Sequence, residues 1–419
     1  MRDMLGREEI ITVEKALELI LKNFSPVFPS ETRLNIEHSY KRILSIDIFS
    51  PEDLPQFARS TVDGFAVGSS DTFGATEGFP SYLNVAGEIL MGAMPAFEIK
   101  KGEAAKIATG GMLPQGADAV VMIEHVQQID EKMIEVMKPV APGENVIQAG
   151  EDVKKGDLIL RKGHSLRPQD VGALAGLGIT EIFVYERPKV SIISTGDEIV
   201  PADRQIKPGQ IRDINSFNLA GLISEAGGEP VKQGIFNDEY NVIKNVVEES
   251  LKDSAIALIT GGSSVGTKDM TAKVINDIGK PGVLFHGVSI KPGKPMIGGL
   301  VNNKPVFGLP GHPAAITVCF EQFIEPVLKK LTGLSENKFA NRKLTVMAKM
   351  TKNIASSPGR EDHIRVSLEE RNGEIWANPI LGKSGLITTM VKADGIAVIP
   401  LRKLGLEQGE VVEVRMFSR

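Results

Sequence analysis

Hydrophobic and polar positions follow two different periods along this chain, and the changes of period divide it into segments. Residues 12–24 (TVEKALELILKNF) predict an amphipathic helix, because Val13, Leu17, Ile20 and Phe24 recur at helical spacing. The threonine that opens this segment is a suitable N-cap. A second helical stretch is predicted over residues 36–47.

Between residues 50 and 139 the pattern changes to short apolar runs separated by glycine and proline, which is typical of a small β-rich domain. Residues 140–186 then predict a loop, a strand, a helix opened by Pro168 and a final strand. Because helical packing resumes there, we expect the β-rich piece to be inserted into a domain begun by the N-terminal helices.

From residue 187 apolar strands alternate with helices, which predicts a mostly parallel sheet covered on both faces. After residue 335 strands alternate with turns instead. The predicted fold class is α/β multi-domain, with a doubly wound α/β sheet domain (187–335), an N-terminal helical and strand domain (1–49 and 140–186), an inserted β-rich domain (50–139) and a small C-terminal β-barrel (336–419).

The net charge and the lengths of the apolar runs limit the kinds of partner that this chain can bind. A formal net charge of -5 over 419 residues gives no global attraction to nucleic acid or to an anionic membrane, so any phosphate or oxyanion needs a local basic cluster. No apolar run reaches the length of a membrane span, and the first residues are acidic, so we expect a cytoplasmic protein. Cys319, the single cysteine, lies in an apolar helical stretch, where a buried role is expected.

A glycine loop follows one predicted strand of the α/β domain. Its order of Thr267 then Lys268 reverses that of an ATP-binding loop. The loop is either a flexible turn or a place where backbone amides and hydroxyls approach an anion at a helix start. Asp269 behind it favours a bound cation such as Mg²⁺, although a carboxylate in a first helical turn is the plainer interpretation. The loop residues concerned are Gly261, Gly262, Ser263, Ser264 and Gly266.

Other strand ends of the same domain carry carboxylates and lysines. Asp197, Glu198 and Asp238 would suit metal binding or acid–base work if the fold brings them together, and helix capping if it does not. Lys291 and Lys294 flank a stiff Pro-Gly turn. Two cations held close together favour an anion between them, although surface lysines alone need no such explanation.

The turn GLPGHP (308–313) comes shortly after these lysines and opens a long predicted helix with Pro310 and Pro313. Its positive end and the two lysines together predict an oxyanion cradle. His312 in that turn is interpreted as a polar turn residue without a chemical role.

The ordered motifs of the chain resemble those of the molybdopterin molybdenumtransferase family, a pattern that the E domain of gephyrin shares. The motifs are RSTVDGFAV, KIATGGMLPQGADAVVMIE, AGEDVKKGD, VSIISTGDEI, ITGGSSVGTKDM, IKPGKP, GLPGHP, PGREDHIRVSL and GKSGLITTMVKADGIAVIP. The resemblance implies that molybdate (or tungstate) and adenylated molybdopterin give molybdenum cofactor and AMP, with Mg²⁺ bound by Glu198 and Asp269. It also implies a homodimer whose active site lies between the α/β domain of one subunit and the β-rich domain of the other, and substrate delivered by a molybdopterin adenylyltransferase.

The same resemblance implies roles for individual residues. The catalytic positions are expected to be Asp63, Thr109, Asp152, Glu198, Asp238 and Asp269. The glycine loop, Pro310 and Pro313 would hold the pterin ligand, and the residues facing molybdate would be Lys291, Lys294, Arg360 and Ser384. Two positions depart from the family, which commonly has asparagine and serine where this chain has His312 and Ala315.

Two other functions fit parts of the pattern. Related α/β domains adenylate molybdopterin with ATP, but those proteins resemble only the α/β unit. A peptide-binding scaffold like gephyrin is the other alternative, and the lack of a long linker or an extra domain in this sequence argues against it.

Overall fold

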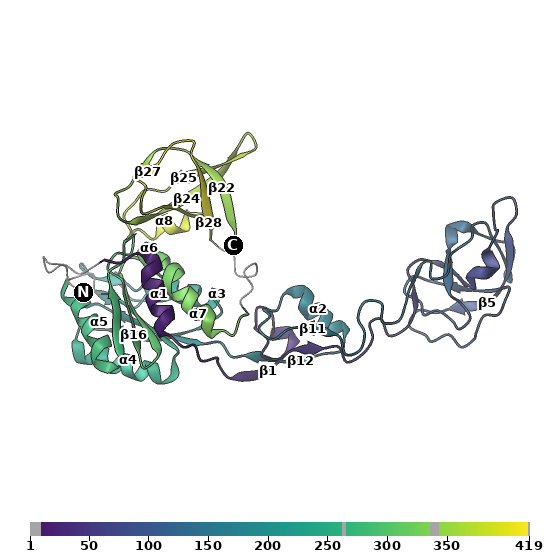
Figure 1. Ribbon diagram of the computed structural model, residues 1–419, viewed down its shortest axis with the longest axis horizontal. Helices are drawn as coiled ribbons and strands as arrows, with labels where there is room; N and C mark the ends of the chain where they lie inside the picture. Colours follow the sequence, from purple (N-terminus) through teal and green to yellow (C-terminus); the bar gives the residue numbers. More distant parts are fainter. Residues whose placement is uncertain (1–9, 262–264, 336–342, 418–419) are drawn as a thin grey trace.

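The computed structural model of the protein describes residues 10–261, 265–335 and 343–417, with the backbone alone at 265–269. It is an elongated molecule in which four units follow one another (Figure 1). A compact α/β unit and a small barrel lie at one end, a slender unit lies in the middle, and a β-rich unit lies at the far end. Among the described helices, none combines the length and the apolar character needed to cross a membrane.

The α/β unit is built on a six-stranded sheet in the order β16-β13-β17-β21-β20-β18. Its first four strands are parallel, and β20 and β18 add an antiparallel edge. The strands are β13 (Lys189–Thr195), β16 (Glu229–Phe236), β17 (Ile256–Thr260), β18 (Pro281–His286), β20 (Ile297–Val301) and β21 (Lys304–Leu309), with a small pair β14 (Ile199–Val200) and β15 (Ile211–Arg212) beside them. The prediction of a mostly parallel α/β sheet is confirmed.

Helices cover both faces of this sheet because its strand residues alternate between two cores. In β17, Ile256 and Leu258 belong to one core, whereas Ala257 and Ile259 belong to the other. The first core is covered by α3, α6 and α7, and the second by α4 and α5. The helices are α3 (Asn215–Glu225), α4 (Tyr240–Asp253), α5 (Val265–Ile278), α6 (Pro313–Cys319) and α7 (Glu325–Leu331), with a π-helical turn (Phe320–Ile324) between the last two.

The N-terminal helix α1 (Val13–Asn23) packs on the α/β unit. Thr12 caps it by accepting a hydrogen bond from the backbone N–H of Lys15, as expected of an N-cap. Ile20 and Phe24 are buried in the first core of the sheet, and the helix lies against β18 and β20. The interpretation that this helix begins the elongated domain is therefore corrected.

The second helix expected over residues 36–47 is also corrected. Only a short 3₁₀ turn, Ile36–His38, forms there, and Ile43 and Leu44 make isolated β-bridges instead. The slender middle unit consists of β1 (Glu31–Asn35) paired with β12 (Glu181–Tyr185), β2 (Ile48–Phe49) paired with β11 (Leu158–Leu160), and α2 (Pro168–Gly176). The helix opened by Pro168 and the strand after it form as predicted.

The β-rich unit is a six-stranded sheet in the order β7-β4-β6-β5-β9-β8. Apolar side chains form a separate core on each of its faces. Its strands are β4 (Gly64–Val67), β5 (Ser81–Ile89), β6 (Glu103–Ile107), β7 (Ala119–Met122), β8 (Val126–Gln128) and β9 (Met133–Val136), with short 3₁₀ turns at Ser69–Thr72 and Ile123–His125, and the pair β3 (Arg59–Ser60) and β10 (Val146–Ile147) leads into it.

The C-terminal unit is a closed barrel of five strands, and the prediction of a small β-barrel is confirmed. Closure follows because β24 pairs with both β25 and β26, in the cyclic order β24-β25-β22-β28-β26. The elements are β22 (Thr345–Met350), β24 (Glu361–Arg371), β25 (Glu374–Pro379), β26 (Gly395–Ile399) and β28 (Val411–Met416), with the pair β23 (Ile354–Ala355) and β27 (Gly405–Leu406) and the short helix α8 (Thr388–Val391). A sixth strand, β19 (Ile290–Lys291), comes from the α/β unit and adds to β24 in parallel.

The placement of α1 generates a test. Replacing Ile20, which is fully buried, with alanine removes side-chain volume from the α/β core and should lower the free energy of unfolding by about 2–5 kcal/mol. Hydrogen exchange should accelerate in β18 and β20, which α1 contacts, and stay unchanged in β1 and β12. Lys22→Ala, an exposed change on the same helix, is the control. Faster exchange confined to the β1–β12 pair would assign the helix to the middle unit after all.

Candidate active site

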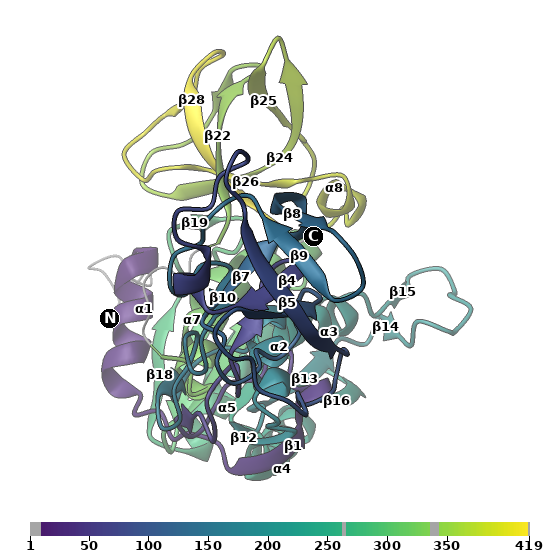
Figure 2. The ribbon, with the colours of Figure 1, turned by 90° about the vertical axis from the view of Figure 1, so that its right-hand side faces the viewer.

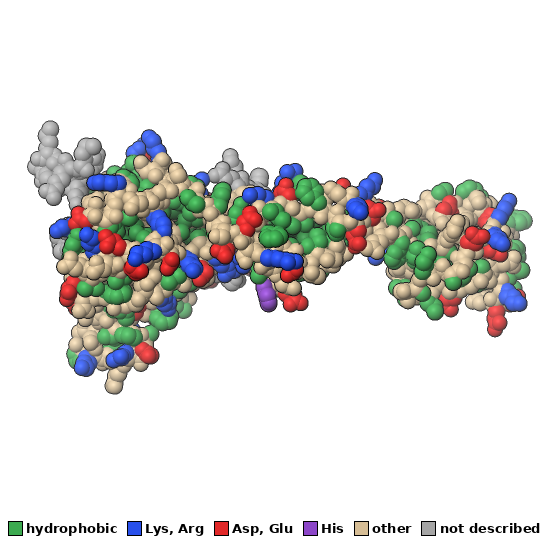
Figure 3. Space-filling view, turned by 90° about the horizontal axis from the view of Figure 1, so that it is seen from below, with side chains coloured by type: hydrophobic (Ala, Val, Ile, Leu, Met, Phe, Trp, Pro, Cys, Tyr) green, Lys and Arg blue, Asp and Glu red, His purple; other side chains and the backbone are tan. Residues whose placement is uncertain are grey.

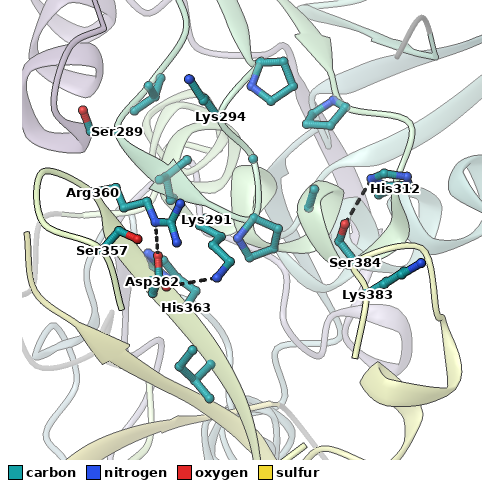
Figure 4. A pocket seen from close by; sticks show the side chains of 18 of the residues that line it. Ser289, Lys291, Lys294, His312, Ser357, Arg360, Asp362, His363, Lys383 and Ser384 are labelled. Carbon is teal, nitrogen blue, oxygen red and sulfur yellow. Dashed lines mark hydrogen bonds and ion pairs between the residues drawn. The ribbon is translucent and has the colours of Figure 1, made fainter. Parts of the chain in front are cut away.

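A cavity of about 930 Å³ lies where the barrel meets the α/β unit (Figure 4). One wall comes from the α/β unit and carries Lys291, Lys294 and Pro310. The facing wall comes from the barrel and carries Arg360 and Ser384. Five residues that the sequence analysis assigns to ligand binding thus line one cavity.

Strand directions explain why the lysines reach this place. Strand β18 is antiparallel to β20, which is antiparallel to β21, so β18 ends at the same edge of the sheet as β17 and β21. The segment after β18 carries Lys291 and Lys294 and therefore emerges beside the turn that follows β21. Between the lysines, Gly293 has a φ of +125°, and a Cβ there would lie 2.7 Å from Cys319 Sγ. Only glycine fits this turn without strain.

Asp362 on β24 holds two of the cations. Its carboxylate accepts a hydrogen bond from Arg360 Nε at 2.8 Å and lies 3.3 Å from Lys291 Nζ, and the residue is fully buried. A buried carboxylate without a partner would be costly, so these contacts fix the position of both basic groups. One carboxylate facing two cations leaves the wall with excess positive charge.

Ser384 and His312 meet across the boundary between the two units. Their Oγ and Nδ1 atoms lie 3.0 Å apart, and the backbone N–H of Ala314 donates to the Ser384 carbonyl at 3.2 Å. The loop 382–385 of the barrel is thereby attached to the start of α6. Both side chains face the same cavity (Figure 4), and Ala315 lines it as well.

Carboxylates gather at a second place on the same sheet edge, after β13 and β16. One Asp238 oxygen is buried without a hydrogen-bond partner among the described residues. Burial raises the pKa of Asp238, Asp197 and Glu198 raise it further, and a hydrogen bond from Thr195 opposes the shift. Such an arrangement of hard oxygen donors fits a divalent cation. The described residues include no complete group of three metal-binding side chains at coordinating positions.

The glycine loop begins next to this cluster. Gly261 has a φ of +134°, and a Cβ there would lie only 2.0 Å from the Thr195 carbonyl oxygen, so glycine is required. A small hollow beside Gly261 is lined by Pro295 and Pro310, which also line the basic cavity. Gly262, Ser263, Ser264 and the side chain of Asp269 lie outside the described residues, while Gly266 lies within α5.

The remaining predicted residues lie elsewhere. Pro313 begins α6 and is buried, and Glu198 is exposed; neither lines the basic cavity. Asp63 and Thr109 do meet, since the Thr109 backbone N–H and hydroxyl donate to one Asp63 oxygen at 2.7 and 2.9 Å and lower the pKa of that carboxyl. They belong to the β-rich unit, however, at the far end of the molecule (Figure 1).

Asp152 lies in the connection between the β-rich and middle units, where its backbone N–H donates to the Leu54 carbonyl at 3.1 Å. Figure 3 shows the molecule from below, and it narrows between the middle unit and the β-rich unit. The β-rich unit is thus set apart from the rest of the chain. Within one chain, the fold therefore brings together the four residues expected to face molybdate but not the predicted site residues of the β-rich unit.

Three family profiles match successive parts of the chain. They describe the MoeA N-terminal region, domains I and II (residues 11–178), a probable molybdopterin-binding domain (191–330) and the MoeA C-terminal region, domain IV (347–417). A molybdopterin molybdenumtransferase of Haemophilus influenzae is 32% identical over 412 residues, which cover 98% of this chain and 99% of that protein. The chain belongs to the MoeA family.

Two further proteins are similar to this chain over almost its whole length. A protein of Methanocaldococcus jannaschii named for molybdopterin biosynthesis is 38% identical over 423 residues, covering 99% of this chain and 98% of its own. The crystal structure of a molybdopterin biosynthesis MoeA protein from Pyrococcus horikoshii matches with a TM-score of 0.82 and 39% identity, covering 98% of this chain and all of the other.

Several polar residues of this cavity are not among the predicted site residues, and Asp362 and His312 are the two whose contacts matter most here. Asp362 carried no signal, because one acidic residue at the start of a strand has many ordinary uses. His312 did carry one, namely its place between two prolines at a strand end and its departure from the asparagine common in the MoeA family. The structure places His312 in the cavity wall in contact with Ser384, a position that its interpretation as a turn residue does not include.

The acidic cluster generates a pH test. Since the folded-state pKa of Asp238 is raised above 3.8, this group lowers stability increasingly as the pH rises through that range, and the penalty is fully present at neutral pH. Without divalent ions, Asp238→Asn should therefore raise the thermal midpoint at neutral pH, with a gain that shrinks as the pH falls toward 3.8.

The matched control is Asp253→Asn at the exposed end of α4, which should change little at any pH. A lower thermal midpoint for Asp238→Asn at neutral pH, with EDTA present, would contradict the electrostatic account of this cluster.

Proposed function

We propose that this protein is a molybdopterin molybdenumtransferase, which inserts molybdenum (or tungsten) from the oxyanion into adenylated molybdopterin and releases AMP. The observation that carries the proposal is the cavity in which Lys291, Lys294 and Arg360 converge from two units. A tetrahedral dianion suits a wall of ammonium, guanidinium and hydroxyl donors, because charge-assisted hydrogen bonds are the strong ones. The adenylated substrate would come from a separate molybdopterin adenylyltransferase.

The glycine loop would hold the pterin ligand and its phosphates. Helix α5 is 14 residues long and starts directly after the loop, so its amino end favours negative charge. Gly261 brings backbone close to the end of β13, and the hollow beside it shares two proline walls with the basic cavity. A ligand in the loop and an oxyanion in the cavity would therefore be neighbours.

The carboxylates after β13 and β16 would hold Mg²⁺, with Glu198 and Asp238 as donors and Asp269 from α5 as a third. One buried oxygen of Asp238 has no hydrogen-bond partner among the described residues, which supports this assignment. When bound, the ion would neutralise charge on the pyrophosphate as AMP leaves. The chain's own part is to orient both ligands, and Lys291 and Arg360 would compensate the charge of the oxyanion.

A homodimer would complete the site. Asp63 and Thr109 form a ready-made pair, with a lowered carboxyl pKa, that the fold keeps at the opposite end of the molecule from the cavity. The β-rich unit lies at the opposite end of the long axis from the α/β unit (Figure 1), and it is the part nearest the viewer in Figure 2. In an antiparallel dimer, Asp63 of the partner subunit and Asp152 of the partner subunit would reach the α/β unit.

The activity is tested with purified protein, adenylated molybdopterin, Mg²⁺ and molybdate. Wild type should release AMP, and Lys291→Ala or Arg360→Ala should raise the KM for molybdate about tenfold or more, because each loses a charge-assisted contact. Lys349→Ala, on the barrel but outside the cavity, is the control. No AMP from authentic substrate would reject the proposal, and consumption of ATP by this chain alone would favour adenylation instead.

The shared site predicts complementation between two impaired variants, assayed at a molybdate concentration well below the raised KM of Lys291→Ala. Asp63→Asn removes a residue that the β-rich unit would supply to the site of the partner subunit. Lys291→Ala removes a residue of the cavity in its own subunit. Mixed subunits should recover about a quarter of wild-type activity, because half of the dimers are mixed and each keeps one intact site of two. Activity that stays at the level of the separate variants after subunit exchange would contradict a shared site.

A further inference from the structure

The contact between His312 and Ser384 joins two units at the wall of the basic cavity. The Nδ1 and Oγ atoms are 3.0 Å apart, and the loop around His312 is fixed by Asn215 of α3, whose Nδ2 donates to the Gly311 carbonyl at 2.9 Å. On the other side, the Ser384 carbonyl accepts from the Ala314 backbone N–H. Both side chains are therefore held in place by backbone contacts on either side.

A serine hydroxyl has a single proton to donate, so the state of its neighbour decides where that proton points. An imidazole with an unprotonated Nδ1 accepts the Ser384 proton, which is then not available to an anion in the cavity. An imidazolium donates from Nδ1 to the Ser384 oxygen instead, which frees the hydroxyl proton for another acceptor and adds a positive charge. Histidine is the side chain that ordinarily makes this change between pH 5 and 8.

We infer that His312 is a positioning residue that makes oxyanion binding in this cavity depend on pH through the Ser384 hydroxyl. In the protonated state, Ser384 donates to the anion and the imidazolium strengthens the positive wall. When the neutral imidazole of His312 accepts the Ser384 proton, the hydroxyl no longer donates to the anion, and the cavity wall has one positive charge fewer. This inference rests on the proposed function, since it takes the cavity as the oxyanion site.

The other charged groups around His312 do not produce this behaviour. Lys383 neighbours Ser384, and the other cations that line the cavity are Lys291, Lys294, Arg360 and Arg365. Lysine and arginine side chains ordinarily titrate far above the range of histidine. Asp362 is already held by Lys291 and Arg360. His363 also lines the cavity, is buried and lies 3.5 Å from Glu361, so it is the one further group there that needs a control.

The test is calorimetric titration of the full-length protein with molybdate, and with sulfate as a tetrahedral dianion that keeps its charge across the range, at several values between pH 6 and 8. Wild-type affinity should rise about tenfold as the pH falls, the effect of a hydrogen bond to a charged group. His312→Asn keeps a polar side chain that does not titrate, and its affinity should stay flat. Because this variant retains His363, the difference from wild type isolates His312.

Ser384→Ala separates the two contributions. It should retain only the part of the pH dependence that comes from the imidazolium charge, and should bind more weakly than wild type at low pH. Equal slopes for wild type and His312→Asn would overturn the inference while leaving the oxyanion cavity intact. Absence of molybdate and sulfate binding to wild type at every pH would overturn both this inference and the assignment of the cavity.

Discussion

The pairing of β19 with β24 is the contact on which the geometry of the cavity depends. Two residues of the α/β unit, Ile290 and Lys291, pair in parallel with Glu361 and Asp362 of the barrel. The Glu361 backbone N–H also donates to the Ser289 carbonyl at 2.9 Å. Backbone hydrogen bonds of this kind fix the register between two units that are otherwise separate folds. Lys291 and Asp362 are adjacent because β19 and β24 pair at these two residues.

Charge balance around Asp362 then determines what the cavity can accept. A fully buried carboxylate needs its partners, and Lys291 and Arg360 satisfy it from both sides. Lys294 and Lys383 also line the cavity, so its basic groups outnumber Asp362, the one carboxylate among the described lining residues. A small anion lowers the resulting repulsion, whereas a neutral apolar ligand does not. The carboxylates after β13 have the opposite imbalance and suit a cation.

The sequence predicted what depends on local pattern and on strand ends. The alternation of Ile256 to Ile259 between two cores, the helix after Pro168 and the convergence of Lys291 and Lys294 near Pro310 all follow from periodicity and topology. The antiparallel edge was missed, although Asn302 and Asn303, at φ of +49° and +68°, form the kind of two-residue turn that joins β20 to β21.

Other features could not be predicted from one sequence. The sequence does not decide whether α1 packs on the middle unit, which follows it in the chain, or on the α/β unit. The apolar face of the helix would suit either, and tertiary packing makes the choice. Asp362 is recognisable only when β19 is known to lie beside β24, and those residues are about 70 positions apart. The predicted site residues of the β-rich unit stay untested, because the chain alone does not bring them to the cavity.

A ligand that contacts both walls of this cavity would link the barrel to the α/β unit. With Lys294 on one side and Ser384 on the other, any anion touching both resists their separation. The joint already rests on the pairing of β19 with β24, on the ion pair between Arg415 and Glu321, and on Ile396 of the barrel, which is buried in the first core of the α/β unit. A bound anion would add one more link between the two units, so that filling the cavity would make the molecule stiffer at this place.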